Sequence, residues 1–284
     1  MNAVTETKEN QRSAVFDRVL VGVDGSTESR EAVRQAAALV DGELSLLAVY
    51  DVAPAIVGGT GFYVPDYSNL DLQRTAATEA LGQAREDAAP ASPTGKIVHG
   101  RAADALIAEV EREQGTLLVL GSHGLGRLAG FVMGSTATEV IHKAPCSVLI
   151  ARRRSESKDL PSKIVVGVDG SPESAAAYAA ARRLAGRLNA ELWPVVANGG
   201  KAVDRGLVDS IVGHRREELP DEPVAALLAA AADADLLVVG SRGLHGLRSL
   251  GSVSERVAHQ AHSSVLVVRT PPWQNDSDAF RETN

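Results

Sequence analysis

The chain has 284 residues, of which 44% are hydrophobic, 23% charged and only 4% aromatic, and its formal net charge is −7. This composition excludes disorder throughout and fits about two globular domains with aliphatic cores. The negative balance argues against nucleic acid or an anionic membrane as partner, because both are bound through clustered positive charge. The single Cys146 cannot form an intrachain disulfide, and neither a signal peptide nor a membrane-length apolar run is visible. We therefore expect a cytoplasmic protein.

The chain contains an internal repeat. RVLVGVDGSTES begins at Arg18 and its near-copy KIVVGVDGSPES at Lys163, while GSTATEVIHKAPCSVLIAR from Gly134 is matched by GSVSERVAHQAHSSVLVVR from Gly251. Self-similarity of this kind predicts tandem units of one fold. The predicted domains and connecting segments are domain one at 16–152, a shortened domain two at 162–269, a linker at 153–162 and polar tails at 1–14 and 270–284.

Strands and helices are predicted to alternate along each copy. Apolar runs predict strands at 19–23, 44–49, 97–98, 117–120 and 147–151 in the first copy, and at 164–168, 192–197, 236–239 and 264–268 in the second. Ser26 and Ser171 are good helix N-caps, and Pro172 suits a first helical position. The alternation predicts the α/β class, as two tandem doubly wound, Rossmann-like parallel sheets.

The middle of the second copy is shorter than that of the first. Val203, Leu207 and Ile211 recur every four residues there and predict one short helix. No third strand is evident in this copy from the sequence.

A glycine-containing loop follows the strand at 117–120. Gly121 and Gly124 lie at its start, and nine further residues lead to Gly134 and Ser135, where a helix over 136–143 is predicted. Glycines allow close backbone approach to a ligand, and a helix N-terminus offers free N–H groups to a phosphate. Open parallel sheets bind ligands at the carboxyl ends of their strands, where Asp24 also lies. The alternatives are an ordinary turn, with Ser135 only a helix cap and Asp24 only a cap of the turn before the first helix.

These motifs, VGVDGS at the first strand, G-x2-G-x9-G-S in the loop and APCSVLIA at the end, resemble those of a tandem universal stress protein. The resemblance covers both copies and implies an ATP-binding site. The residues that it assigns to adenine are Val23, Asp24 and Val49, and those that it assigns to ribose and phosphates are Gly121, His123, Gly124, Gly134, Ser135 and Thr136.

The second copy departs from that pattern. The equivalent residues are Asp169, Ala197, Gly240, Gly243, Gly251 and Ser252. Only seven residues separate Gly243 from Gly251, and Ser252 with Glu255 forms the S-x-x-E pattern of a capping box. We therefore expect weak or absent nucleotide binding in this copy.

The leading functional hypothesis is a non-catalytic stress-response regulator that binds ATP, with Mg²⁺ as an optional companion. The alternatives are a slow ATP hydrolase and a structural interaction module that binds no nucleotide. No G-x4-G-K-[ST] loop is present, which disfavours a P-loop NTPase. Arg127 in the glycine loop is either a phosphate contact or a surface residue. Cys146 is interpreted as a small buried residue, and His259 and His262 lack the further ligands that zinc needs.

The last strand of each copy is expected to lie at a sheet edge. Edges are usually paired or covered, so residues 147–151 and 264–268 are predicted to pair antiparallel and join the two copies into a compact internal pseudo-dimer. Family resemblance implies the same arrangement, and chains are expected to pair further into a homodimer. The alternative is two independent domains on a flexible linker.

Overall fold

A computed structural model gives the fold. It describes residues 15–51, 54–57, 62–65, 69–113, 116–124, 133–152, 161–199, 203–241 and 251–269. The first-repeat elements are β1 (Arg18–Val23), α2 (Thr27–Leu39), β2 (Glu43–Tyr50), β3 (Pro54–Val57), β4 (Phe62–Pro65), α3 (Leu70–Asp87), β5 (Thr94–His99), α4 (Ala102–Glu113), β6 (Thr116–Gly121), α5 (Ser135–Lys143) and β7 (Val148–Ala151). The second-repeat elements are β8 (Lys163–Gly167), α6 (Pro172–Leu188), β9 (Glu191–Ala197), α7 (Arg205–Val212), β10 (Glu217–Leu219), α8 (Pro223–Ala230), β11 (Leu236–Gly240), α9 (Ser252–Gln260) and β12 (Ser264–Val268). The predicted tails lie outside the described residues, as does nearly all of the linker.

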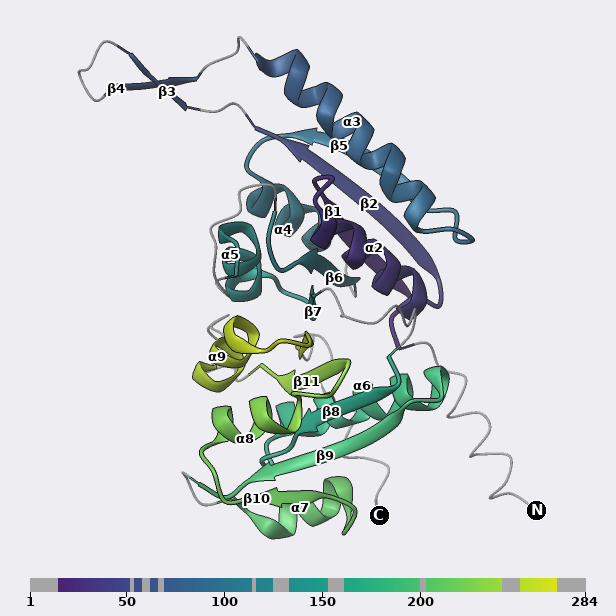
Figure 1. Cartoon of the computed structure of the whole chain (residues 1–284), viewed down its shortest axis with the longest axis vertical. Helices are drawn as coiled ribbons and strands as arrows, with labels where there is room; N and C mark the ends of the chain where they lie inside the picture. Colours follow the sequence, from purple (N-terminus) through teal and green to yellow (C-terminus); the bar gives the residue numbers. More distant parts are fainter. Residues whose placement is uncertain are drawn as a thin grey trace.

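Ten strands form one sheet that runs through both repeats (Figure 1). The order is β10-β9-β8-β11-β12-β7-β6-β1-β2-β5, and all pairs are parallel except β12 with β7. If only the strands of this sheet are counted within each repeat, the third (β5 or β10) is outermost, followed by the second, first, fourth and fifth. This order confirms the predicted tandem doubly wound α/β class. The predicted antiparallel pairing of the last strands is also confirmed, with Leu266 opposite Leu149.

The strands and first helices form where the sequence favours them. Ser26 and Ser171 cap α2 and α6, each accepting a hydrogen bond from the backbone N–H three residues later at 3.1 Å, and Pro172 is the first helical residue. Along β1, Val19 and Val21 contact one hydrophobic cluster and Leu20 another. This alternation is the period of a strand whose two faces are both buried.

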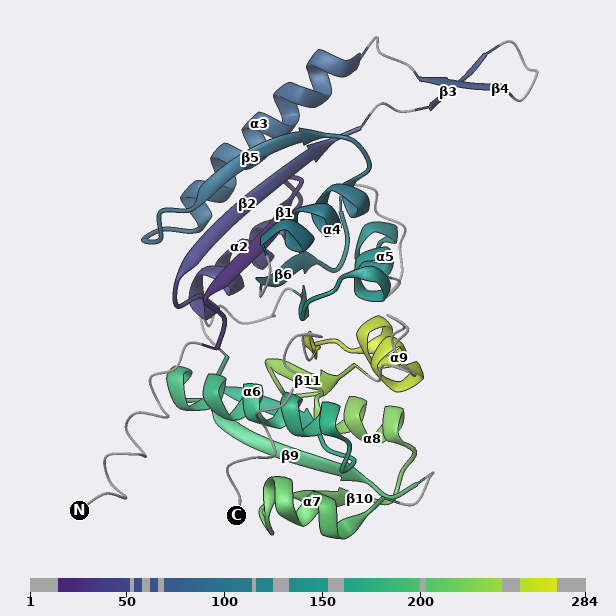
Figure 2. The same cartoon turned by 180° about the vertical axis from the view of Figure 1, so that it is seen from behind.

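Helices cover both faces of the sheet (Figures 1 and 2). The apolar faces of α2, α3 and α6 pack into one hydrophobic cluster, and those of α4, α5, α8 and α9 into another. Each cluster takes strand residues from both repeats: Val19 and Ile164 lie in the first, Leu20 and Val165 in the second. Each of these two cores therefore extends across the β7–β12 junction.

Two arginines brace that junction in an approximately symmetric way. Arg152, after β7, donates hydrogen bonds to the carbonyls of Ala258, at the end of α9, and Ser263. Arg269, after β12, donates to the carbonyl of Ile141, near the end of α5. The last turn of a helix leaves carbonyls without intrahelical partners, so each arginine satisfies acceptors at a helix end in the other repeat. Arginine burial at the junction lowers the pKa of Arg152 to about 10.

Two features of the middle segments differ from the sequence-based predictions. The second repeat does have a third strand, β10, which pairs in parallel with β9. In α7 the buried residues are Val208 and Val212, whereas Leu207, expected on the apolar face, is 52% exposed. The predicted short helix is present, but its buried face lies one residue further along.

The first repeat contains a projecting unit that has no counterpart among the described residues of the second. Strands β3 and β4 form a separate antiparallel hairpin, followed by the long helix α3. The hairpin extends away from the body of the molecule in both views (Figures 1 and 2). It follows β2 directly, at the carboxyl end of that strand.

Candidate functional site

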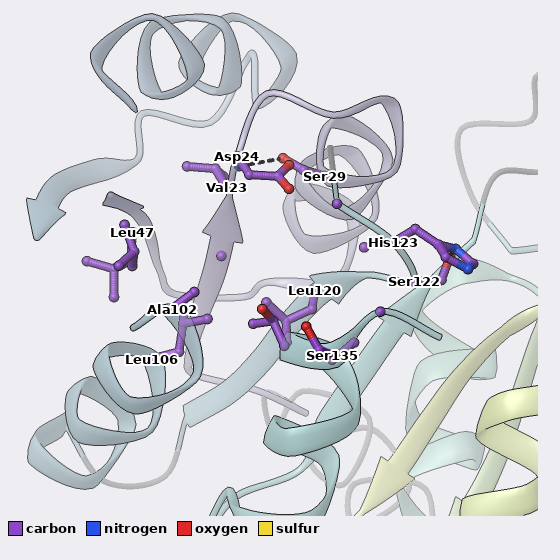
Figure 3. Close-up of a pocket in the computed structure, with 17 residues that line it drawn as sticks. Val23, Asp24, Ser29, Leu47, Ala102, Leu106, Leu120, Ser122, His123 and Ser135 are labelled. Atoms are coloured by element: carbon purple, nitrogen blue, oxygen red, sulfur yellow. Dashed lines mark hydrogen bonds between the residues drawn. The ribbon is translucent and has the colours of Figure 1, made fainter. Parts of the chain in front are cut away.

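A pocket of about 320 Å³ opens at the carboxyl ends of the central strands of the first repeat. All nine residues that the sequence predicted for the first site line it: Val23, Asp24, Val49, Gly121, His123, Gly124, Gly134, Ser135 and Thr136. Figure 3 labels four of them, Val23, Asp24, His123 and Ser135. They come from the ends of β1, β2 and β6 and from the start of α5. The doubly wound topology brings these ends together at the point where the strand order reverses. In such sheets this is where ligands bind.

Asp24 holds the turn between β1 and α2. Its Oδ1 accepts a hydrogen bond from the backbone N–H of Ser26 at 2.9 Å, and its own N–H donates to Oγ of Ser29 at 3.2 Å (Figure 3). The alternative role, a cap for this turn, is therefore confirmed. Asp24 also lines the pocket, so the turn fixes a carboxylate at the pocket wall.

Two glycines of the loop have different structural reasons to be glycine. A methyl group added at Gly121 would lie 2.7 Å from the backbone carbonyl carbon of Glu28, so β6 and α2 approach too closely there for any side chain. A methyl group at Gly124 would instead lie 2.5 Å from Oδ2 of Asp24, the end of a side chain. Gly121 is thus required for packing of strand against helix, and Gly124 leaves room for the Asp24 carboxylate.

The N-terminus of α5 faces the pocket without a side-chain cap. The N-cap is Gly134, with no side-chain hydrogen bond, and the helix starts at Ser135. The alternative that Ser135 caps this helix is therefore wrong. The first N–H groups of a helix have no intrahelical acceptors and carry partial positive charge. Gly134, Ser135 and Thr136 together present backbone donors and two hydroxyl groups at this wall.

An apolar wall, which was not predicted, is formed by Leu47 of β2 and by Ala102 and Leu106 of α4, on the side away from His123 (Figure 3). Leu120 of β6 also lines the pocket. His123 lies beside the polar wall, with its Nδ1 3.0 Å from Oγ of Ser122, while its buried Nε2 has no partner among the described residues. A pocket with one apolar and one polar wall suits a flat, partly apolar ligand that carries an anionic group.

A second pocket, of about 310 Å³, occupies the equivalent place in the second repeat. Of the predicted residues, Asp169, Ala197, Gly240, Gly251 and Ser252 line it, and Gly243 lies outside the described residues. The predicted capping box is wrong, because Gly251 is the N-cap of α9 and Glu255 instead lies 3.3 Å from Nε2 of His142 on α5. Gly240 repeats the packing role of Gly121 against Glu173.

The fold and these sites define a tandem doubly wound α/β protein with one glycine-lined pocket per repeat. The chain belongs to the universal stress protein family, whose profile matches residues 16–152 and 196–269. A universal stress protein of Mycolicibacterium smegmatis is 31% identical over 91% of this chain and 99% of its own length. One from Mycobacterium tuberculosis is 30% identical over 88% and 96%.

A solved structure confirms the fold at the level of the whole chain. The universal stress protein of Archaeoglobus fulgidus DSM 4304 superposes with a TM-score of 0.69 at 20% identity, covering 91% of this chain and 99% of the other. Within the described ranges, no helix is both long and apolar enough to cross a membrane.

Proposed function

We propose that the first pocket binds ATP and that the protein acts as a non-catalytic regulator whose state follows that ligand. The observation that carries the proposal is the uncapped N-terminus of α5 at the polar wall. Gly134 supplies no side chain to satisfy the first N–H groups of the helix, whereas α2 and α6 are capped by serines. Free N–H groups at a helix start are a ready site for phosphate.

The other walls fit the rest of such a ligand. Val23 and Val49 flank the apolar side, where Leu47 and Leu106 offer contact to a base. Asp24, the sole carboxylate among the described lining residues, would accept hydrogen bonds from an amino or hydroxyl group. The volume of about 320 Å³ lies at the small end of the range of roughly 300–1,000 Å³ for ligand pockets.

Gly124→Val tests the proposal. The new side chain would displace the Asp24 carboxylate and occupy the space beside the α5 N-terminus, so we expect ATP binding in the first pocket to be lost. Binding is measured by equilibrium dialysis, after circular dichroism has established that the variant is folded.

Gly186→Ala is the matched control, because a methyl group there, on α6, meets nothing within 4 Å. Mass spectrometry of the small molecules released from freshly purified, denatured protein identifies the bound ligand. Undiminished ATP binding by folded Gly124→Val would refute the proposal.

A further inference from the structure

The two pockets have nearly the same volume but different charged linings. Among the described residues of the first lining, Asp24 is the only carboxylate and there is no lysine or arginine; Arg127 of the glycine loop lies outside the described residues. The second lining contains Asp169, Glu173 and Glu222, together with Arg256. Two sites of one chain with equal size and unequal charge are expected to select different ligands.

The difference arises at two positions where the repeats carry residues of opposite charge. In the first repeat Arg101 precedes α4 and pairs with Glu139 of α5, with Nη2 2.8 Å from Oε2. In the second, Glu222 precedes α8 and Arg256 lies on α9 at the position matching Glu139. Cation and anion have therefore exchanged places between the helices.

The exchange changes what these side chains do. Neither Arg101 nor Glu139 lines the first pocket, and the two residues pair with each other. Glu222 and Arg256 both line the second pocket, from opposite helices, and make no ion pair within the described residues. Arg256 donates from Nε to the carbonyl of Ser252 at 3.2 Å, a bond within its own helix. Its terminal nitrogens have no hydrogen-bond partner among the described residues.

Two smaller replacements act in the same direction. Val253 stands in the second lining where Thr136 stands in the first, so one hydroxyl donor is missing beside the helix start. Ala197 takes the place of Val49, which leaves more room at the base side. Ser254 stands where the first lining has Ala137, but its hydroxyl donates to the carbonyl of Gly240 at 2.6 Å. The start of α9 thus offers one hydroxyl donor fewer than the start of α5, and the apolar end is wider.

We propose that the second pocket is a site for a nucleoside monophosphate and that it rejects the triphosphate. Arg256 binds the single phosphate, since a guanidinium forms charge-assisted bonds to phosphate oxygens. Glu222 and Asp169 accept hydrogen bonds from the amino and hydroxyl groups of the nucleoside. Among the described lining residues, additional phosphates would meet three carboxylates and one cation, and their charge would be repelled. The nucleoside part of this inference rests on the function proposed for the first pocket.

The test is equilibrium dialysis of the full chain with labelled AMP or ATP. In Gly124→Val, whose first pocket is blocked, we expect one AMP per chain and ATP binding at least about tenfold weaker. Arg256→Ala added to that variant should weaken the binding of AMP about tenfold, which is the scale of one lost charge-assisted hydrogen bond. Glu222→Gln should narrow the preference for AMP over ATP. Glu139→Gln, at the matching position outside the first pocket, is the control and should leave AMP binding unchanged.

The outcomes separate this inference from the function proposed for the first pocket. ATP bound by Gly124→Val as tightly as AMP, or AMP binding unaffected by Arg256→Ala, would overturn the inference. If the wild-type chain binds no ATP while Gly124→Val still binds AMP, the inference is supported and the function proposed for the first pocket is refuted. If Gly124→Val does not fold, labelled AMP is measured on the wild-type chain saturated with ATP, with the same Arg256 and Glu222 variants.

Discussion

Gly121→Ala tests the packing role of the glycine that ends β6. The added methyl group would lie 2.7 Å from the carbonyl carbon of Glu28 and 2.9 Å from its oxygen, whereas ordinary contacts begin at 3.4 Å. Strand and helix would have to separate by roughly 0.7 Å to restore a normal contact. The opposing atoms belong to the first turn of α2, so no side-chain rotation can relieve the clash.

The expected loss of stability follows from this geometry. Overpacking a well-packed interior costs typically about 1–3 kcal/mol, and a clash between backbones belongs at the upper end of that range. We therefore expect the free energy of unfolding to fall by about 3 kcal/mol in Gly121→Ala. Gly240→Ala should behave alike, because its methyl group would lie 2.5 Å from the carbonyl oxygen of Glu173.

Urea unfolding monitored by circular dichroism measures the effect. Gly186→Ala, in the open on α6, serves as control and should gain up to about 1 kcal/mol from the better helix propensity of alanine. A Gly121→Ala chain within about 0.5 kcal/mol of the wild type would refute the assigned close approach, since the overpacking range starts at about 1 kcal/mol.

Three further predictions concern buried or half-buried polar groups. Oδ2 of Asp235 accepts hydrogen bonds from Oγ of Ser162 at 2.7 Å and from the N–H of Lys163 at 3.0 Å. Asp235→Ala should therefore lower the free energy of unfolding in urea by about 1–3 kcal/mol, and no loss would contradict the anchoring role of this carboxylate. Burial raises the pKa of Cys146 to about 12, so at pH 8 its thiol should react with a disulfide reagent only after denaturation, and rapid native labelling would be contrary evidence. Burial lowers the pKa of His259, so the stability contributed by the neutral imidazole is present above pH 6.5 and is lost as the pH falls below that value. Between pH 7 and 5 the wild type should therefore lose more stability than His259→Gln. Equal losses in the two proteins would speak against this role of His259.

The fold could be predicted largely because the strands are apolar runs with clear ends. The internal repeat fixed the number of units, and Ser26 and Ser171 marked helix starts that the structure confirms. The strand β10 could not be predicted, since Glu217 and Glu218 make up most of it. Its pairing depends on the neighbouring β9, and such tertiary context overrides local preference.

Only those residues of the candidate site that belong to a sequence motif could be predicted. Glycines and hydroxyl residues have recognisable spacing, so Gly124 and Ser135 could be placed at a pocket from sequence. Leu106 on α4 and Leu47 on β2 look like any buried leucine in the sequence, and only the fold shows that they line the pocket. The packing role of Gly121 was likewise invisible, because it depends on how closely a distant helix approaches.

The two shared cores have a consequence for how the molecule unfolds. Val19 and Ile164 lie in one cluster and Leu20 and Val165 in the other, so neither repeat can lose its packing without exposing apolar surface of its neighbour. The repeats should therefore melt in a single cooperative transition, even after proteolysis between residues 153 and 160. A ligand bound in either pocket would then raise the melting temperature of the whole chain, by the mass-action term that links occupancy to stability.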